Sequence, residues 1–545
     1  MPSHPTDLPL SHPPQLDALF DARAAAHPDR PALHVEERVI SYAALAARKA
    51  GVRDALLDAG LFDAHRSIGL LCAKAADAYA AMLAIMASGN VYVPLNPGHP
   101  PERIRKIVES ARLSTFVVDA ASFPAIAGWL VEVAADVTVF MLNASSDAAV
   151  AHPANVRLRA VRPADGAPVR PAAAHTCELA YLMFTSGSTG APKGVPVKHA
   201  NVLALLAGLR PVLALHGDDR LTHFAELSFD FSVGEIFPCW DAGACLYLPS
   251  QVDLLDPAAF VRRHGLTVWS SVPTLGAYVQ QLAALSSGRM PTLRLALFCG
   301  EALPTGLARF WHDAAPDARI VNLYGPTEAT VFATSYTFDP AAPPPGEWVP
   351  IGEPFDTVLA RIDTAGEPDR PIGELLLAGP QVVERYWGEA GASGESAGRF
   401  VADPAIADRR WYRTGDLVSR SPHHGYVFHG RADHQVKVRG FRIELQEIEA
   451  TLRRLLPDQQ VAVVAARGGV GQEAELVAFC ARLDIDRDEL ARRCALELPA
   501  YMVPHVVMAL APFPVNVNGK VDYLSLQRLA AAALAEPEAV PAPAR

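Results

Sequence analysis

Hydrophobic runs alternate with helical patterns through most of the chain. Residues 67–72 have the continuous apolar character of a buried strand, residues 75–87 predict a helix, and residues 91–94 predict another strand. Strands that alternate with helices are typical of parallel sheets covered by helices. A strand-rich section, residues 351–420, follows the proline-rich loop at 339–350, so we do not place a domain boundary in that loop. The pattern predicts a large α/β domain with a β-rich subdomain.

The last part of the chain follows a different pattern. Residues 460–466 and 475–481 are two strand-like runs around a glycine-rich turn, and residues 505–510 predict a further strand. A helix is expected from about Arg487, with Asp486 as its N-cap. These elements predict a small α+β domain, followed by a frayed Ala/Pro/Glu tail.

The composition narrows the functional class. The formal net charge is −11, without the basic excess expected of a nucleic-acid binder. The polar, proline-rich N-terminus does not resemble a secretory signal, and no stretch approaches the ~18 apolar residues of a membrane span. Seven cysteines without a metal-binding pattern fit a reducing compartment. We therefore expect a cytoplasmic protein that neither binds nucleic acid nor spans a membrane.

A glycine-rich loop is the first candidate for chemistry. A predicted strand ends at Phe184 and is followed by Thr-Ser-Gly-Ser-Thr-Gly at 185–190 and Ala-Pro-Lys-Gly at 191–194. Glycines allow close backbone approach, and free N–H groups and hydroxyls suit phosphate oxygens. Lys193 adds a positive charge. The glycine run alone fits a flexible serine–glycine connection equally well.

The full string resembles the signature loop of the adenylate-forming enzymes, which include acyl-CoA synthetases, luciferases and the adenylation domains of peptide synthetases. Further motifs match in the family's order: residues 90–97, 322–328 (Asn-Leu-Tyr-Gly-Pro-Thr-Glu), 412–416 (Tyr-Arg-Thr-Gly-Asp), 430–433 (Gly-Arg-Ala-Asp) and 518–520 (Asn-Gly-Lys). Alone, the 322–328 motif could be a Gly-Pro turn before a helix. The resemblance implies a large domain at 1–430, a small mobile domain at 431–530 and a flexible tail at 531–545.

The resemblance also implies a site for ATP and Mg²⁺. Tyr324 would stack on adenine, Thr327 would touch the α-phosphate, and Glu328 would hold Mg²⁺. Asp416 would bind the ribose, Arg431 the nucleotide, and Asp433 would be the hinge. The implied catalytic residues are Lys520, Thr185 and Glu328. The implied nucleotide contacts are Thr185, Ser186, Gly187, Ser188, Thr189, Gly190, Lys193, Gly300, Glu301, Ala302, Asn322, Tyr324, Gly325, Thr327, Asp416, Arg431 and Lys520.

Asp230 indicates the type of acid. It stands where amino-acid-activating members of the family hold the substrate ammonium, and a buried carboxylate needs a cationic partner. The remaining implied pocket positions are Phe231, Gly234, Thr274, Leu297, Cys299, Leu323, Val331 and Phe332. None is charged, so we expect a small or apolar side chain.

Residues 268–274 and 297–303 resemble the D-alanine–carrier protein ligases, in which a cysteine at the Cys299 position lies beside the substrate α-carbon. Gly234 could enlarge the pocket, whereas Phe231 and Phe332 could reduce it. D-alanine, L-alanine, another small aliphatic amino acid and a β-amino acid all stay open.

The implied reaction ends on a thiol. After adenylation the small domain would rotate about Asp433, and the segment at 435–444, which by itself predicts an amphipathic strand with a solvated basic edge, would help to form a thiol tunnel. No carrier domain follows Lys520, so we expect a separate carrier protein with a phosphopantetheine arm, which Arg453 and Arg454 could contact. The alternatives are an acyl- or aryl-CoA synthetase that uses free coenzyme A, and a non-catalytic protein on the same scaffold.

Overall fold

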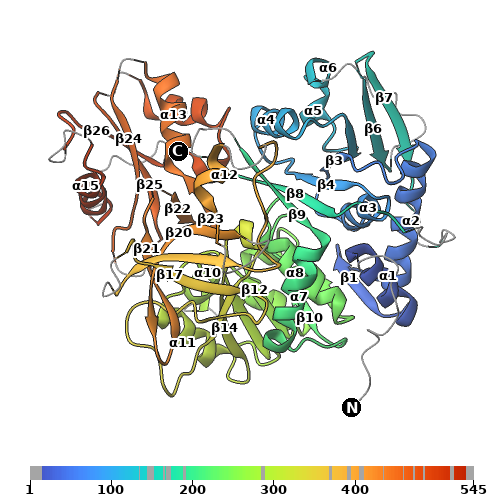
Figure 1. The fold of residues 1–545 in the computed structure, drawn as a ribbon, viewed down its shortest axis with the longest axis horizontal. Coiled ribbons are helices and arrows are strands. Elements are labelled where there is room, and N and C mark those ends of the chain that lie inside the picture. The colour runs from blue at the N-terminus through green and yellow to red at the C-terminus, as the bar shows by residue number, and fades with distance from the viewer. Residues whose placement is uncertain are drawn as a thin grey trace.

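A computed structural model places two large sheets, a β-rich subdomain and a small C-terminal unit (Figure 1). The residues that it describes are 15–133, 136–143, 153–163, 166, 174–187, 192–283, 289–366, 371–389, 394–403, 410–433, 435–457, 459–469, 473–482, 485–515 and 521–535.

The first large sheet has seven strands. In spatial order they are β7 (Val156–Val161), β6 (Val137–Leu142), β5 (Thr115–Asp119), β3 (Ser67–Leu71), β4 (Val91–Leu95), β8 (Leu179–Thr185) and β9 (Lys193–Lys198). All neighbours are parallel except β8 and β9, which form an antiparallel hairpin around the glycine-rich loop. The predicted strands at 67–72 and 91–94 are confirmed as β3 and β4.

The second large sheet has nine strands. In spatial order they are β16 (Glu353–Pro354), β15 (Thr334–Thr337), β14 (Arg319–Tyr324), β13 (Leu295–Phe298), β12 (Val268–Ser271), β10 (Arg220–Thr222), β11 (Cys245–Tyr247), β1 (Pro31–Val35) and β2 (Arg38–Ser41). The strands from β14 to β1 are parallel, and the edge strands are antiparallel. The prediction of parallel α/β sheets is therefore confirmed.

Helices cover both sheets. They are α1 (Leu16–Ala26), α2 (Tyr42–Asp58), α3 (Ala76–Ala87), α4 (Pro101–Ala111), α5 (Pro124–Ala127), α6 (Leu130–Val133), α7 (His199–Leu213), α8 (Phe231–Asp241), α9 (Pro257–His264), α10 (Pro273–Ala283) and α11 (Thr305–Ala314), with 3₁₀ turns η1 (Asp253–Leu255) and η2 (Thr327–Ala329). Helix α1 contacts both α3 and α8, which lie on the first and second sheets. No described helix is long and apolar enough to cross a membrane.

The predicted strand-rich section forms an antiparallel subdomain. Its strands are β17 (Leu359–Asp363), β18 (Gly373–Ala378), β20 (Arg410–Ser421), β19 (Phe400–Ala402) and β21 (Gly425–Arg431), and α12 (Gly394–Arg399) packs against β20. The expected boundary between 430 and 431 falls on the last residue of β21 and stays a prediction.

The C-terminal unit begins with a hairpin. Its elements are β22 (Gln435–Val438), β23 (Phe441–Glu444), α13 (Leu445–Leu455), β24 (Val461–Ala466), β25 (Glu475–Cys480), α14 (Arg487–Cys494), η3 (Ala500–Met502), β26 (Val506–Ala509) and α15 (Tyr523–Ala535). The Asp486 side chain accepts hydrogen bonds from the Asp488 and Glu489 amides, which confirms the predicted cap. Helix α15 extends to Ala535, into the segment expected to be a tail.

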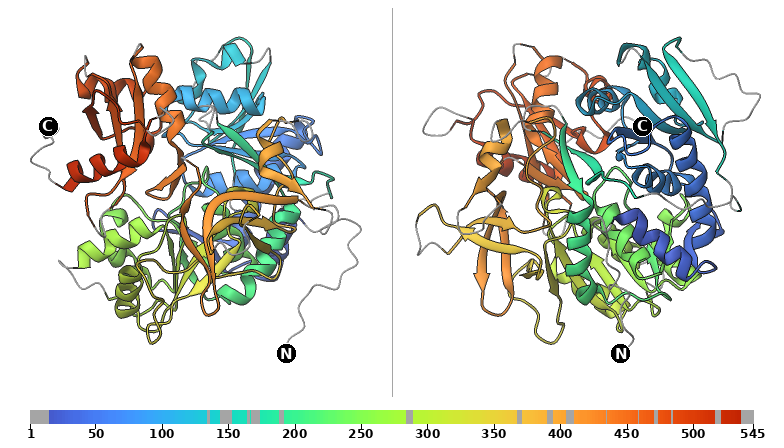
Figure 2. Two further views of the ribbon diagram at one scale, coloured as in Figure 1. Left: turned by 60° about the vertical axis from the view of Figure 1, so that its left-hand side comes forward. Right: turned by 45° about the vertical axis from the view of Figure 1, so that its right-hand side comes forward.

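Both faces of β24 are apolar because a helix covers each. Alternate side chains of a strand point to opposite sides. Val461 and Val463 belong to the hydrophobic cluster that contains α13, whereas Ala462 and Val464 belong to the cluster that contains α15. In the left view of Figure 2 this orange and red unit lies above the green second sheet and beside the blue first sheet. A buried ion pair between Arg103 of α4 and Glu447 of α13 joins it to the first sheet.

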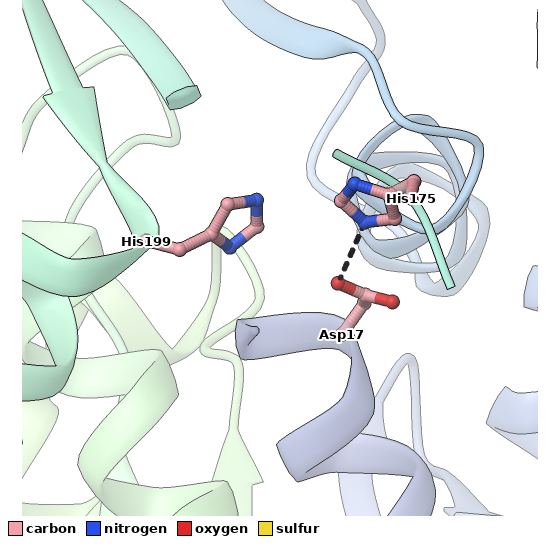
Figure 3. A group of neighbouring side chains, drawn as sticks. All are labelled: Asp17, His175 and His199. Atoms are coloured by element: carbon pink, nitrogen blue, oxygen red, sulfur yellow. Dashed lines mark ion pairs between the residues drawn. The ribbon is translucent and has the colours of Figure 1, made fainter. Parts of the chain in front are cut away.

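Three buried side chains anchor α1 near the base of the β8–β9 hairpin (Figure 3): Asp17 of α1, His175 before β8, and His199 at the start of α7. Their ligand-type atoms lie within 4.8 Å of one another, and Nε2 of His175 is 3.5 Å from the Asp17 carboxylate. The Leu16 amide donates to Nδ1 of His199 (3.2 Å), so the proton of this neutral ring is on Nε2. These hydrogen-bonding and charged groups tie α1 to the segments that flank the hairpin.

This anchor makes stability depend on pH. Burial lowers the pKa of His199 from 6.5 to about 4, although Asp17 opposes the shift. The folded state disfavours the protonated ring. The contribution of His199 to the free energy of unfolding is therefore complete above pH 6.5 and is lost as the pH falls towards 4. From pH 7 to pH 5, the free energy of unfolding of His199→Asn should fall by about 2 kcal/mol less than that of wild type. Asparagine keeps an acceptor for the Leu16 amide. Denaturant unfolding at both pH values measures this, with the exposed His216→Asn as control; equal losses in all three proteins would contradict it.

Candidate active site

The candidate site lies at the carboxyl edge of the second sheet. Loops that follow parallel strands meet at one edge, where ligands bind in open α/β sheets. Thr274 follows β12, Cys299 follows β13, and Tyr324 ends β14, while Asp230 immediately precedes α8 after the loop from β10. The fold therefore gathers predicted pocket and nucleotide residues that are up to about a hundred positions apart in sequence.

The apolar pocket positions belong to one hydrophobic cluster. Its members here are Phe231, Leu297, Cys299, Leu323, Val331 and Phe332. A Cβ placed on Gly234 would lie 2.4 Å from Cε2 of Phe332, so the ring occupies the space that a larger residue at 234 would need. The rings of Phe231 and Phe332 meet edge to face, with centroids 5.6 Å apart. Gly234 therefore does not enlarge the pocket, because Phe332 fills the space.

The loop that carries Phe332 is held in an unusual backbone conformation. Thr330 and Val331 have φ values of 58° and 69°, a region that β-branched residues rarely adopt. The Gln381 side chain donates to the Phe332 carbonyl (2.7 Å), and the Thr330 hydroxyl donates to the Gln381 carbonyl (2.5 Å). These bonds fix the position of the Phe332 ring.

Asp230 is buried at the start of α8. Burial raises its pKa, and the Thr327 hydroxyl and the more distant Lys437 only partly offset this effect. None of the ion pairs among the described residues includes Asp230. The carboxylate therefore lies in a place where a cationic ligand would stabilise its charged form.

Burial keeps the Cys299 thiol protonated. Burial raises the pKa of its thiol to about 12, with only partial compensation from Lys437. A thiol with that pKa is protonated at neutral pH, and the thiolate is the reactive form. Cys299 is thus a small buried residue of the hydrophobic cluster, and its place in the substrate pocket stays a prediction.

The predicted nucleotide residues border a cavity of about 1250 Å³ between the second sheet and the C-terminal unit. Those that line it are Gly300, Glu301, Ala302, Asn322, Tyr324, Asp416 and Arg431, together with Asp433 and the pocket residues Thr274 and Leu323. Asn322 is held in place by donating to the Pro350 carbonyl (2.9 Å). Gly325 has no room for a Cβ, which would lie 2.5 Å from the Val331 carbonyl oxygen.

Asp416 is the centre of a charged network beside this cavity. The Tyr324 hydroxyl donates to one carboxylate oxygen (2.5 Å), and Arg431 donates to the other (2.5 Å). Arg431 also binds Asp433 through two nitrogens (2.7 and 2.9 Å), and Arg399 binds Asp433 as well (2.9 Å). The predicted adenine, ribose and hinge residues are therefore linked directly.

Glu328 is fully buried, and both of its oxygens are occupied. Tyr386 donates to Oε1 (2.8 Å), and Arg442 of β23 donates to Oε2 (2.7 Å). Burial alone would raise the pKa of Glu328, but Arg442 and the Tyr386 hydroxyl outweigh it and lower the pKa to about 2. The carboxylate is ionised and is a hard oxygen ligand of the type that Mg²⁺ prefers, yet Arg442 neutralises it in this arrangement.

The glycine-rich loop is described in part. Thr185 ends β8 opposite Lys193, and the Lys193 ammonium lies 4.9 Å from the centroid of the Tyr386 ring. The Ser186 hydroxyl donates to the Arg442 carbonyl (2.8 Å), and Gly187 donates its amide towards Glu447. Ser188, Thr189, Gly190 and Lys520 lie outside the described residues.

The interpretation of residues 435–444 as one strand with a solvated basic edge was wrong. The segment is a two-stranded hairpin that turns at Arg439 and Gly440, and the Arg442 side chain is only 14% exposed where it pairs with Glu328. The Gly440 amide donates to Glu301 (2.7 Å), which also accepts from the Thr274 hydroxyl (2.7 Å). The glycine between charged positions was the available signal for a hairpin turn, but the buried partner of Arg442 is distant in sequence.

Arg453 and Arg454, considered for carrier contact, are paired within the C-terminal unit. Arg453 donates to Glu449 (2.8 Å), and Arg454 donates to Glu497 (2.5 Å) and to the Thr451 hydroxyl (3.0 Å). Both side chains are about half exposed. These pairs weaken the case for them as carrier contacts.

Comparison with known proteins identifies the family. Residues 20–387 match the model of the family described as AMP-binding enzyme. This chain is an AMP-binding enzyme. It belongs to the adenylate-forming superfamily that its motifs resemble, and the large α/β domain with a smaller C-terminal domain agrees with that family's structures.

Relatives of this AMP-binding enzyme are peptide synthases. It is 30% identical to tyrocidine synthase 3 of Brevibacillus parabrevis over 96% of its length, and 32% identical to malpinin synthetase of Mortierella alpina over 94% of its length. It spans only 8% and 6% of those much longer proteins.

Solved structures cover nearly the whole enzyme. The Vibrio cholerae adenylation domain AlmE, in complex with glycyl-adenosine-5′-phosphate, matches 98% of this chain and 100% of its own, with 29% identity and a TM-score of 0.83. Holo-PA1221, a peptide-synthetase protein with adenylation and PCP domains bound to a vinylsulfonamide inhibitor, matches 95% of this chain and 84% of its own, with 25% identity and a TM-score of 0.74.

Proposed function

We propose that this enzyme adenylates a small or apolar amino acid with ATP, releases pyrophosphate, and transfers the aminoacyl group to the phosphopantetheine thiol of a separate carrier protein. The observation that carries the proposal is the buried carboxylate of Asp230 beside the apolar pocket. Because burial raises the pKa of this carboxyl, the site would gain from a cation, and the ammonium of an amino acid supplies one. The likeness to AlmE, bound to an aminoacyl-adenylate, supports the same assignment.

Adenylate formation would occur between this pocket and the nucleotide cavity. The substrate carboxylate attacks the α-phosphate, an acyl–phosphate bond forms, and the bond to pyrophosphate breaks. Lys520, Thr185 and the loop amides would stabilise charge on the phosphate oxygens, and Asp416 would accept hydrogen bonds from the ribose hydroxyls. Glu328 is the residue that would hold Mg²⁺, which when bound supplies further charge stabilisation to the phosphates.

Thioester formation would follow at the same carbonyl. The carrier thiol attacks the acyl carbon, and AMP leaves with the bond electrons on its phosphate oxygen. Residues 431–530, with Asp433 as hinge, would reorient between the two steps, as domain closures do in other enzymes. Holo-PA1221 contains adenylation and PCP domains together, which supports a carrier as acceptor. An acyl- or aryl-CoA synthetase is the alternative, and the buried Asp230 argues against it.

The packing of Phe332 against Gly234 favours a small side chain. Since the ring fills the space beside Gly234 and packs against Phe231, little volume is left at this end of the pocket. Glycine, D-alanine, L-alanine, other small aliphatic amino acids and short β-amino acids fit this description. The non-polar lining excludes charged side chains, because a buried charge would have no partner.

The proposed activity is tested in two stages with the purified enzyme. Pyrophosphate exchange with ATP is measured over a panel of D- and L-amino acids, β-amino acids, and fatty and aryl acids. The best substrate is then offered with either coenzyme A or holo-carrier proteins. We expect exchange with a small amino acid and acylation of a carrier. Exchange only with acids that lack an amino group, or efficient loading of coenzyme A alone, would favour the CoA-synthetase alternative.

Replacing Asp230 should separate amino-acid binding from nucleotide binding. In Asp230→Asn the ammonium loses its charge partner, at a cost of ~3 kcal/mol, so kcat/KM for the amino acid should fall more than about a hundredfold. The KM for ATP should change little. Asp241→Asn is the matched control, because Asp241 is equally buried at the other end of α8, where it binds Arg210. An unaltered amino-acid KM in Asp230→Asn contradicts the assigned role.

Shortening Phe332 should widen the substrate range. Phe332→Leu removes the part of the ring that lies against Gly234, so larger aliphatic side chains should gain roughly tenfold or more in kcat/KM relative to the native substrate. Phe338→Leu is the control, since Phe338 is buried in a different hydrophobic cluster. The comparison is made by pyrophosphate exchange with a homologous series of amino acids. If Phe332→Leu ranks the amino acids by kcat/KM in the same order as wild type, another residue limits the size of the pocket.

A further inference from the structure

Arg442 binds the carboxylate that the proposed function assigns to Mg²⁺. It reaches Glu328 from the hairpin at 435–444, which belongs to the C-terminal unit, whereas Glu328 follows β14 of the second sheet. The ion pair measures 2.7 Å from Nη1 to Oε2, and Glu328 is completely buried. The other oxygen accepts from Tyr386 at 2.8 Å. Neither oxygen is left without a donor.

A metal ion on the same carboxylate would be close to the guanidinium. An Mg²⁺–oxygen bond is about 2.1 Å long, so an ion on Oε2 would lie no more than about 4.8 Å from Nη1. Two cations at that distance repel each other strongly where water is excluded. The hairpin backbone that carries Arg442 is held at this place, because the Ser186 hydroxyl donates to the Arg442 carbonyl (2.8 Å).

Two further contacts make the hairpin move as one piece. The Gly440 amide is bonded to Glu301 of the second sheet, and Phe441 packs flat on Tyr501 of the C-terminal unit with ring centroids 3.9 Å apart. Phe441 also faces Phe229, one residue before Asp230, at 5.9 Å. Moving the hairpin out of the site would therefore break contacts that join the C-terminal unit to the site.

We propose that Arg442 and a divalent cation compete for Glu328, so that the hairpin docks in the site only after the metal ion has left with pyrophosphate. Arg442 is a positioning residue in this scheme: it replaces the lost positive charge and holds the C-terminal unit in the docked orientation. Metal departure and docking are thereby coupled through one carboxylate. The inference rests on the proposed role of Glu328, but its test does not require turnover.

The test measures metal binding directly. Mn²⁺ replaces Mg²⁺ at oxygen sites, and its free form is quantified by electron paramagnetic resonance. Without nucleotide, we expect Arg442→Gln to bind Mn²⁺ roughly tenfold more tightly than wild type, equivalent to about 1.4 kcal/mol. Adding Glu328→Gln to that variant should abolish the gain. Arg439→Gln is the matched control, because Arg439 lies in the same hairpin but pairs with Glu473, and it should bind Mn²⁺ as wild type does.

A second measurement uses the unmodified protein. Hydrogen exchange of residues 435–444 is followed with a non-hydrolysable ATP analogue, either with Mg²⁺ or with a chelator. Mg²⁺ should speed exchange of the hairpin amides in wild type, and Glu328→Gln should remove that effect. Equal Mn²⁺ affinity in wild type and Arg442→Gln, or a hairpin indifferent to Mg²⁺, would overturn the competition. Either result is independent of which acid, if any, the pyrophosphate-exchange panel identifies.

Discussion

The parallel arrangement of β10, β12, β13 and β14 is the constraint on which the site depends. Since these strands run in one direction, the loops that follow them reach the same edge of the sheet. That edge receives Asp230, Thr274, Cys299 and Tyr324 from separate parts of the sequence. The C-terminal unit then meets the same edge through its hairpin, so that one line of loops borders both the apolar pocket and the nucleotide cavity.

Two buried carboxylates at this edge have opposite electrostatic surroundings. Burial acts on both and favours their neutral forms. At Glu328 the Arg442 guanidinium outweighs burial and lowers the pKa, whereas at Asp230 burial dominates and raises it. One carboxylate already has its cation from the protein. The other would acquire one only from a ligand, which is why Asp230 is the better indicator of the substrate's charge.

Shape and charge thus act at different points of the pocket. Phe332, held by Gln381 and a strained turn, would limit the size of the substrate side chain, whereas Asp230 would select for an amino group. Both elements stand on rigid supports, since Phe332 packs on α8 through Gly234 and Asp230 begins the same helix. Helix α8 therefore positions both Phe332, which would limit the substrate side chain, and Asp230, which would bind its amino group.

Local patterns in the sequence determined the elements and the type of chemistry. The buried strands at 67–72 and 91–94, the Asp486 cap and the glycine-rich loop depend on neighbouring residues, so they could be predicted from short windows. The ordered motifs were sufficient to indicate the superfamily. Tertiary structure alone decided the partners: that Phe332 fills the space beside Gly234, that Gly440 binds Glu301, and that Arg442 pairs with the buried Glu328. These contacts join residues 98 to 139 positions apart, and no local pattern of hydrophobic and polar residues specifies which distant side chain a charge or a ring will meet.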